Sequence, residues 1–177
     1  MALLKNQNAL VTGGGSGIGL ACAKAFAADG ANVLIMGRNE EKLAAASDEL
    51  RTLGRGEIQV AVGDVSSDSD VNMAVETAAI GCVLDIAVAN AGIGGLGPII
   101  ATESESWDQI MQTNLNGTFY TLKHSGRWMA KSGGGAICAI SSIAGVRTHR
   151  FMGPYCVSKA GIDMLVRNTA DELGTAN

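Results

Sequence analysis

A glycine-rich turn near the start of the chain constrains the fold more than any other stretch. It lies at residues 13–19, which include five glycines, between a buried apolar segment at 8–12 and an alanine-rich run at 20–27. The apolar segment predicts a strand and the alanine-rich run predicts a helix, so the three pieces together are typical of a phosphate-binding loop. Glycines let the backbone approach a pyrophosphate closely, and the helix N-terminus offers it N–H donors. A flexible linker is the alternative, which the clear patterns on either side disfavour.

The same alternation of strand and helix continues through the rest of the chain. Further strands are expected at 32–36, 58–62, 84–89 and 136–140, and further helices at 40–53, 68–80, 103–131 and 154–173. Strands that alternate with helices of this length form right-handed βαβ units around a parallel sheet. Because no linker or repeat interrupts the 177 residues, we expect one α/β domain over 1–177 with a doubly wound parallel sheet.

Polar residues mark the expected ends and interruptions of the helices. Ser67 with Asp70, and Thr102 with Glu105, resemble capping boxes. Asn114 weakens the long helix that follows Thr102, so either a local kink or a functional asparagine is expected there. The buried side of that helix is expected to carry its apolar residues: Trp107, Ile110, Met111, Leu115, Phe119 and Leu122.

The composition argues against several function classes. A net charge of −4 disfavours general binding to nucleic acid or to an anionic membrane. No apolar run approaches the roughly 18 residues of a membrane span, and the N-terminus lacks the layout of a signal peptide. The four cysteines are scattered, with no CxxC pair and no histidine cluster beside them. We therefore expect free thiols packed in the core of a cytoplasmic protein, and no metal site.

A tyrosine and a lysine near the C-terminus form a candidate acid/base pair. Tyr155 and Lys159 are four residues apart and so lie one turn apart on the same helix face, and Pro154 suits the first position of that helix. A cation about 4 Å away favours an ionised phenol by roughly 4 kcal/mol at an effective dielectric of 20. Such a phenol could exchange a proton with a substrate oxygen. The alternative is a tyrosine and a lysine with no function on the surface of an amphipathic helix. If this pair were the only motif in the chain, that alternative would be preferred.

Six motifs together resemble the short-chain dehydrogenase/reductase family over nearly the whole chain. In chain order they are Thr12-Gly13-x-x-x-Gly17-Ile18-Gly19, Asp64, Asn90-Ala91-Gly92, Asn114, Ser142 and Tyr155-x-x-x-Lys159. Each motif alone is weak evidence, whereas all six in this order and context are specific. The resemblance implies a Rossmann fold and an oxidoreductase that moves a hydride between an NAD(P) nicotinamide and an alcohol/carbonyl pair.

The resemblance also implies a role for each catalytic residue. Tyr155 would be the general acid/base, and Lys159 would promote its ionisation while binding the nicotinamide ribose. Asn114 would hold a water in the proton relay. Ser142 would bind the substrate oxygen, and it is preferred over Ser141 because the family's serine lies thirteen positions before the tyrosine.

The residues that the resemblance implies for cofactor binding are Gly13, Ser16, Gly17, Ile18, Gly19, Arg38, Asp64, Val65, Asn90, Tyr155 and Lys159. In this fold an acidic residue after the second strand binds the ribose 2′-hydroxyl, whereas an arginine accommodates a 2′-phosphate. Gly37 stands at the acidic position and Arg38 follows it, so NADP(H) is expected, with NAD(H) as the alternative. Ser16 stands where NADP-dependent members often carry a further basic residue.

Two other functions fit the same motifs less well. A catalytically silent dinucleotide sensor or scaffold would not need the complete set of Asn114, Ser142, Tyr155 and Lys159. A nucleotide-sugar epimerase of the related extended type also uses a tyrosine and a lysine, but such enzymes are longer and differ in the first glycine turn.

The substrate and partners can be narrowed further. Arg147, His149 and Arg150 precede Tyr155 and would favour an anionic substrate such as a 3-oxoacyl thioester that carries phosphates; solvated loop charges are the alternative. Similar family members pair their two long helices, so a homodimer or homotetramer is expected through helices 103–131 and 154–173. His124, on the first of these helices, is expected at the surface or the interface, and His149 in solvent.

Two features depart from the family pattern. Ala89 replaces the first asparagine of the family's Asn-Asn-Ala-Gly, which puts some local hydrogen-bond support in doubt. Members also continue past the last helix with further strands and a substrate-covering segment, whereas this sequence ends at Asn177. Strand 136–140 would then be an unprotected apolar edge. We expect a C-terminally incomplete version of the enzyme that binds cofactor weakly, turns over poorly and aggregates.

Overall fold

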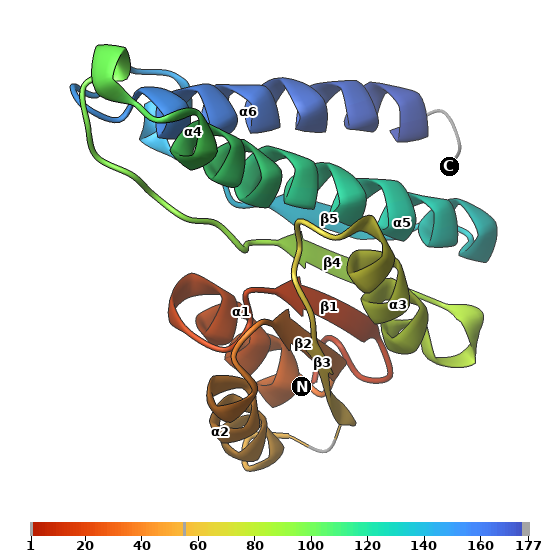
Figure 1. Ribbon diagram of the computed structural model, residues 1–177. Helices are drawn as coiled ribbons and strands as arrows, with labels where there is room; N and C mark the ends of the chain where they lie inside the picture. The colour runs from red at the N-terminus through yellow and green to blue at the C-terminus, as the bar shows by residue number, and fades with distance from the viewer. Residues whose placement is uncertain (1, 55, 175–177) are drawn as a thin grey trace.

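The computed structural model describes residues 2–54 and 56–174. Its centre is a sheet of five parallel strands in the order β3-β2-β1-β4-β5 (Figure 1). The strands are β1 (Asn8–Thr12), β2 (Asn32–Gly37), β3 (Ile58–Val62), β4 (Ile86–Ala89) and β5 (Ala136–Ala139). The prediction of a doubly wound parallel sheet is confirmed.

Helices connect the strands. They are α1 (Gly17–Ala28), α2 (Glu40–Arg51), α3 (Asp68–Ala78), α4 (Ser104–Ile110), α5 (Gly117–Ser132) and α6 (Gly153–Leu173), with 3-10 turns η1 (Ile80–Cys82), η2 (Ile99–Ala101) and η4 (Ile143–Gly145). The predicted strands, and the helices α2, α3 and α6, agree with these bounds to within two residues.

The strand order reverses at β1, and this reversal positions the functional site. β1 pairs with β2 on one side, where Ala9 faces Val33, and with β4 on the other, where Ala9 faces Ile86. In open α/β sheets, ligands bind in the crevice at the carboxyl ends of the strands where the order reverses. The glycine turn follows β1 directly and therefore opens into this crevice.

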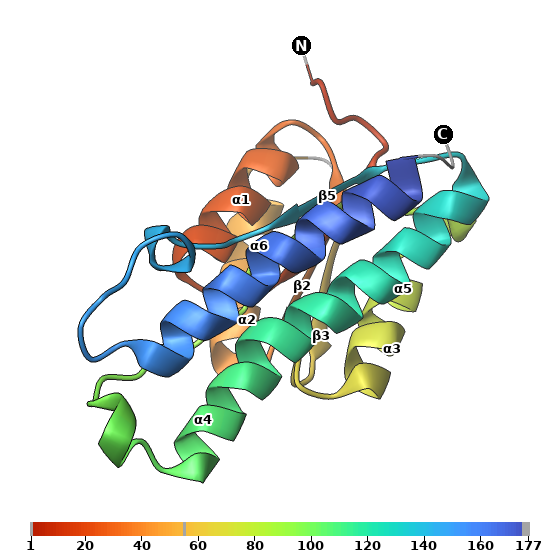
Figure 2. The same ribbon diagram turned by 90° about the horizontal axis from the view of Figure 1, so that it is seen from above.

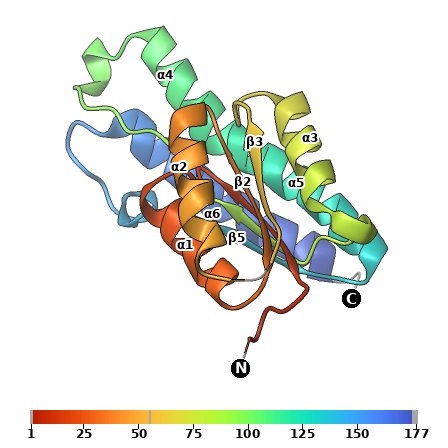
Figure 3. The ribbon, with the colours of Figure 1, turned by 90° about the horizontal axis from the view of Figure 1, so that it is seen from below.

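Both faces of the sheet are covered at its centre, and alternate residues of β1, β2 and β4 enter separate cores. In β1, Ala9 and Val11 pack with residues of α1 and α2, whereas Leu10 packs with residues of α3 and α5. Figure 2 shows α5 and α6 side by side over one face, and Figure 3 shows α1 and α2 over the other. Burial on both faces explains why the strands are almost continuously apolar.

The helix starts agree with one predicted capping box and disagree with the other. Ser67 begins α3 as predicted, because its Oγ accepts a hydrogen bond from the N–H of Asp70 at 3.3 Å. The second box, predicted at Thr102, is wrong. α4 begins after Glu103 without a side-chain cap, and the Thr102 hydroxyl donates instead to the Pro98 carbonyl within the preceding turn.

The helix predicted over 103–131 consists of three pieces. A π-helical segment, η3 (Met111–Asn116), separates α4 from α5 and contains Asn114. The expected local irregularity at this asparagine is therefore a π-helical segment. Such segments often mark functional sites, because the widened turn changes the direction of its side chains and carbonyls.

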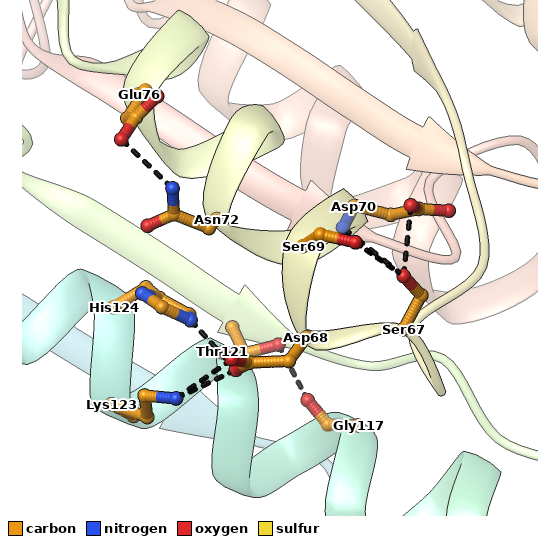
Figure 4. Close-up of polar contacts among 10 residues, drawn as sticks. All are labelled: Ser67, Asp68, Ser69, Asp70, Asn72, Glu76, Gly117, Thr121, Lys123 and His124. Atoms are coloured by element: carbon orange, nitrogen blue, oxygen red, sulfur yellow. Dashed lines mark hydrogen bonds and ion pairs between the residues drawn. The ribbon is translucent and has the colours of Figure 1, made fainter.

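The buried side of α5 is more polar than the apolar pattern predicts. Phe119 is 43% exposed, whereas His124, expected at the surface or an interface, is buried. Nε2 of His124 lies 2.8 Å from Oδ1 of Asp68, and Nζ of Lys123 lies 2.8 and 2.9 Å from the two Asp68 oxygens (Figure 4). Both side chains face the neighbouring helix α3, where the Asp68 carboxylate gives the buried His124 and the half-buried Lys123 a partner.

The link between α3 and α5 depends on the charge of Asp68. The hydrogen bond from Lys123, followed by the one from His124, holds the pKa of the Asp68 carboxyl below its usual value. A carboxyl with a lowered folded-state pKa stabilises the fold above its unfolded pKa and loses that contribution as the pH falls through the folded value. The Asp68 carboxylate therefore contributes its full stabilisation at neutral pH. It loses this contribution only when acid protonates it, below the usual pKa of an aspartate.

β5 forms an unprotected edge of the sheet, as predicted. Its residues Ala136 and Cys138 are exposed. Its alternate residues Ile137 and Ala139 face a hollow of about 250 Å³ beneath α5 and α6, which Leu122, Met129, Val166 and Leu173 also line. An apolar edge of this kind offers unpaired N–H and C=O groups to another strand.

The cysteines are less buried than predicted. All four are free thiols, but Cys82 and Cys138 are exposed and Cys22 and Cys156 are half-buried, so the expectation that they fill the core is wrong. Cys138 is exposed because it lies on the edge strand. No helix in the described part of the chain has both the length and the apolarity to cross a membrane.

Candidate active site

The glycine turn at 13–19 closes tightly around the ends of β1 and β4. Gly13 has a φ of +65°, and a Cβ on it would lie 2.8 Å from Nδ2 of Asn90. A Cβ on Gly19 would lie 2.5 Å from the same nitrogen and from the Gly13 carbonyl oxygen. Asn90 fixes the turn by donating from Nδ2 to the carbonyls of Thr12 at 2.9 Å and Gly13 at 3.3 Å. Close backbone approach therefore requires glycine at both positions.

Thr12 supplies hydrogen bonds beside Ala89, the residue that departs from the family pattern. Its Oγ1 accepts from the N–H groups of Asn90 at 3.0 Å and Ala91 at 3.3 Å, and it donates to the Val88 carbonyl at 3.3 Å. Ala89 itself is buried in β4. The position of Asn90 is thus supported although the preceding asparagine is absent.

The start of α1 differs from those of α2 and α3. Both α2 and α3 begin with a side-chain cap and carry acidic residues in the first turn, whereas α1 has neither feature. Ser16 occupies the N-cap position of α1, but its side chain makes no cap hydrogen bond. The first-turn N–H groups and the positive end of the helix dipole therefore suit an anionic group such as a pyrophosphate.

A hollow of about 310 Å³ lies at the carboxyl ends of β1 to β4, beside this turn. Its wall contains seven of the residues predicted to bind the cofactor, namely Gly13, Ser16, Ile18, Arg38, Asp64, Val65 and Asn90, and also Gly37, Gly63, Ala91, Gly92, Ile93 and Thr113. Gly17, Gly19, Tyr155 and Lys159 do not line it. The glycine residues in the wall, the uncapped start of α1 and the charged side chains fit a dinucleotide.

Arg38 and Asp64 form an ion pair on the wall of the hollow. Arg38 Nη1 lies 3.6 Å from Asp64 Oδ2, and the arginine side chain is 60% exposed. The N–H of Asp64 donates to Oδ2 of Asp70 at 3.0 Å, while Oδ1 of Asp64 accepts from the N–H of Ser66 at 2.9 Å. The bond from the Asp64 N–H, followed by that from the Ser67 hydroxyl, lowers the pKa of the Asp70 carboxyl. Asp70 therefore stays ionised and holds Asp64 in place.

Tyr155 and Lys159 lie in the first turns of α6, as predicted. Lys159 Nζ lies 5.6 Å from the centre of the Tyr155 ring and donates to the Ile140 carbonyl at 2.6 Å. Burial lowers the pKa of the Lys159 ammonium, and the Asp163 carboxylate partly opposes this effect. A Cβ on Gly92 would lie 3.8 Å from Nζ, so the ammonium lies directly behind one wall of the hollow.

Asn114 lies behind the same wall. Its side chain is fully buried, and Oδ1 accepts from the N–H of Ile93 at 2.8 Å. Nδ2 donates to the Ile93 carbonyl at 2.9 Å and to Oγ of Ser158 at 3.0 Å. A Cβ on Gly92 would lie 3.2 Å from Oδ1. The structure thus brings Asn114 and Lys159 together on either side of Gly92.

The two adjacent serines have different partners. Oγ of Ser142 accepts from the N–H of Ala144 at 3.1 Å and so caps η4, whereas Oγ of Ser141 donates to the Lys159 carbonyl at 3.4 Å. η4 packs against α6, where a Cβ on Gly145 would lie 3.1 Å from that same carbonyl oxygen. Because Ser142 accepts in its hydrogen bond, its own O–H can donate to another group.

Several residues that shape the site have little or no signal in the sequence. Ile93 and Thr113 line the hollow, Ser158 binds Asn114, and Asp70 holds Asp64. Among them only Asp70 carries a signal, its spacing from Ser67, and that spacing predicts a helix cap. The others depend on contacts between segments that are distant in the chain.

Two exposed loops meet next to the start of α6 (Figure 1). The N–H of Gly97 donates to the Phe151 carbonyl at 2.8 Å, and Gly97 pairs with Met152 in a single β-bridge. The exposed large apolar side chains of these loops are Leu96, Ile99, Ile100, Ile143, Val146 and Phe151. Arg147, His149 and Arg150 are exposed beside them, and the Arg150 guanidinium lies 4.9 Å from the centre of the Phe151 ring.

Comparisons with known proteins agree with this arrangement. The family described as short chain dehydrogenase matches residues 7–177. The 3-oxoacyl-acyl-carrier-protein reductase FabG of Chlamydia muridarum is 36% identical over 178 residues, covering 99% of this chain and 71% of that protein. A short-chain type dehydrogenase/reductase from Mycobacterium ulcerans has a TM-score of 0.95 and 42% identity, covering 98% of this chain and 64% of that one.

A structure of NAD+-bound xylitol dehydrogenase has a TM-score of 0.94 at 30% identity, covering 99% of this chain and 68% of that one. The matches thus include nearly all of this chain but only 64 to 71% of each relative. The chain belongs to the short-chain dehydrogenase/reductase family of NAD(P)-dependent oxidoreductases.

Proposed function

We propose that this chain interconverts an alcohol and a carbonyl compound with a nicotinamide dinucleotide. The observation that carries the proposal is the grouping of Lys159 and Asn114 at the Gly92 wall of the hollow, with the Tyr155 ring centre 5.6 Å from the Lys159 ammonium. A bound nicotinamide supplies or accepts the hydride. The chain's own residues must then orient the substrate oxygen and move one proton to or from it.

Each catalytic residue has a proposed task. Tyr155 exchanges the proton with the substrate oxygen, and the buried Lys159 ammonium lies 5.6 Å from the centre of its ring. Ser142 donates its O–H to the same substrate oxygen. Asn114, held by both backbone groups of Ile93, anchors the water through which the proton reaches solvent. The residues on the wall of the hollow hold the dinucleotide.

The direct test is turnover of a panel of ketones and alcohols with NADPH, NADH and their oxidised forms. We expect steady consumption of one reduced cofactor with at least one carbonyl compound. The fall in absorbance at 340 nm measures this consumption. Tight binding of a dinucleotide without turnover of any substrate would contradict the proposal and support a silent sensor or scaffold.

We propose NADP(H) as the preferred cofactor. Arg38 lies on the wall of the hollow, and Gly37 places no carboxylate at the position that would bind a 2′-hydroxyl. The ion pair of Arg38 with Asp64 is long and largely exposed, so releasing the guanidinium to a 2′-phosphate costs little.

Arg38→Ala is expected to weaken NADPH binding roughly 10- to 100-fold while changing NADH binding much less, because a hydrogen bond to a charged group contributes about 1.5–3 kcal/mol. Fluorescence titration of both cofactors measures the effect. Arg51→Ala, which removes an arginine paired with Asp48 at the end of α2, is the matched control and should change neither affinity. Tighter binding of NADH than NADPH by the unmodified chain would contradict the preference.

We further propose an acyl thioester with an anionic, phosphate-bearing carrier, such as a 3-oxoacyl thioester, as the substrate. One relative is named as a reductase of such a compound, and another as a dehydrogenase of a sugar alcohol. The exposed loops favour the first kind, because Leu96 is 83% and Ile100 95% exposed next to Arg147 and Arg150. An apolar acyl chain with an anionic carrier complements both features.

Arg147→Ala combined with Arg150→Ala is expected to lower kcat/KM for an anionic acyl thioester about tenfold and to leave a neutral ketone with the same acyl group unaffected. The difference should shrink as salt is added, because exposed charges are screened within about 10 Å at 0.1 M ionic strength. Lys131→Ala, at the far end of α5, is the control. Equal kcat/KM for the anionic and neutral substrates in the unmodified chain would contradict the proposal.

A homodimer or homotetramer through α5 and α6 and a cytoplasmic location stay predictions. Phe119 on α5, and Val157 and Met164 on α6, are exposed apolar side chains that such an interface would cover. Light scattering of the purified chain tests the oligomer, and a monomer at micromolar concentration would contradict the predicted dimer or tetramer. The location rests on a separate observation, because the four free thiols favour a reducing compartment.

A further inference from the structure

Two fully buried polar side chains link α6 to the π-helical segment η3. Asn114 and Ser158 are both 0% exposed, and they are joined by the hydrogen bond from Asn114 Nδ2 to Ser158 Oγ at 3.0 Å. Ser158 Oγ in turn donates to the Tyr155 carbonyl at 2.8 Å. Ser158 thus contacts the backbone of one proposed catalytic residue and the side chain of another, and it directly precedes Lys159.

The direction of every hydrogen bond in this network is determined. The Tyr155 carbonyl can only accept, so the Ser158 hydroxyl must donate its single hydrogen there and can only accept from Asn114. The N–H of Ile93 requires an oxygen opposite it, and the Ile93 carbonyl requires an N–H. Together these partners allow one orientation of the Asn114 carboxamide, with Oδ1 beside Gly92.

We propose that Ser158 is a positioning residue for this active site. It does not touch the substrate; it acts by holding the Asn114 carboxamide and by coupling the first turn of α6 to Ile93 on the wall of the hollow. The proposal rests on the proposed oxidoreductase function, since the residues that Ser158 positions are those of the proton path.

A packing role alone would not require a hydroxyl at this position. Helix α6 places Ser158 at a fully buried site, where alanine would suit the helix better and would avoid burying a polar group. Ser158→Ala removes the acceptor of one Asn114 N–H and the donor to the Tyr155 carbonyl at once. Asn114 then loses the partner that ties it to α6, and Tyr155 and Lys159 can shift relative to the wall.

The experiment compares Ser158→Ala and Ser158→Thr with Ser125→Ala. Ser125 is an equally buried serine on α5 whose Oγ has no hydrogen-bond partner among the described residues, so it is a matched control for the loss of a buried hydroxyl. We expect Ser158→Ala to lower kcat roughly 10- to 100-fold, as misplacement by an ångström does, with the cofactor Kd within about twofold. Ser158→Thr keeps the hydroxyl and should recover most of kcat, and Ser125→Ala should change neither quantity.

A second measurement does not depend on turnover. In an NMR spectrum of the 15N-labelled chain, the side-chain amide signals of Asn114 should be sharp and slow to exchange, and should shift and exchange faster in Ser158→Ala but not in Ser125→Ala. A Ser158→Ala variant that loses melting temperature but keeps kcat, or one that leaves the Asn114 signals unchanged, would overturn the proposal. If the unmodified chain shows no turnover at all, the proposed function fails, and the amide signals alone decide the role of Ser158.

Discussion

Tyr155→Phe is expected to lower kcat by about 10²- to 10⁴-fold, the range that general acid–base catalysis supplies. The substitution removes only the hydroxyl that exchanges the proton. The ring stays in the first turn of α6, 5.6 Å from the Lys159 ammonium, and the Ser158 bond is to the Tyr155 backbone. The glycine turn and Arg38 lie elsewhere on the wall of the hollow, so the cofactor Kd should remain within about twofold.

The chain contains one other tyrosine, and it provides the control. Tyr120 lies on α5 and packs against the core between the sheet and α3. Tyr120→Phe also deletes one phenolic hydroxyl and should leave kcat within about twofold. Stopped-flow and steady-state assays with the same carbonyl compound give both values. If Tyr155→Phe keeps more than a tenth of the original kcat, Tyr155 is not the proton donor.

The centre of the sheet is predictable from the sequence because β1, β2 and β4 are buried on both faces. The run 33–36 is continuously apolar, since Val33 and Ile35 pack with residues of α1 and α2 while Leu34 and Met36 pack with residues of α3 and α5. Glycine and polar residues then mark the end of each run. The position of every strand follows from this local signal, whereas the order β3-β2-β1-β4-β5 is seen only in the structure.

The polar side of α5 is not predictable in the same way. Phe119 looks like a core residue and is exposed, whereas His124 looks like a surface residue and is buried against Asp68. The deciding partner lies 56 positions earlier in the chain, at the start of α3. Thr102 shows that a prediction can also fail for a local contact. Its hydroxyl donates to the Pro98 carbonyl and does not accept from a helix N–H as expected.

Some residues of the candidate site are likewise predictable from local sequence and others are not. The motif residues Tyr155, Lys159 and Asn114 are evident from type and spacing, and the structure places the last two together at Gly92. Ser158 lies within the tyrosine–lysine motif but carries no signal of its own, because its partner Asn114 is 44 positions away. Local patterns thus identify groups that can carry chemistry, whereas the groups that orient them emerge only from packing between distant segments.

Gly19→Ala is expected to have the largest effect of any single methyl group added to the glycine turn. The new Cβ would lie 2.5 Å from both the Gly13 carbonyl oxygen and Asn90 Nδ2, so the backbone of the turn or the Asn90 side chain must move. Overpacking of this kind costs about 1–3 kcal/mol in the free energy of unfolding. The displaced Asn90 also releases the Thr12 and Gly13 carbonyls, so we expect dinucleotide affinity to fall at least tenfold.

Gly15→Ala separates this steric effect from the general effect of replacing a glycine. A Cβ on Gly15 would first meet Leu43 Cδ2 at 3.4 Å, an ordinary contact, and Gly15 has no positive φ. A compatible Gly→Ala change stabilises by about 0.4–1 kcal/mol through the unfolded chain, so Gly15→Ala should keep or slightly raise the unfolding free energy in urea. Dinucleotide titration of both variants completes the comparison. If Gly19→Ala matched Gly15→Ala in stability and affinity, the turn would have room to relax, and close packing of α1 on β1 and β4 would not be what places the dinucleotide.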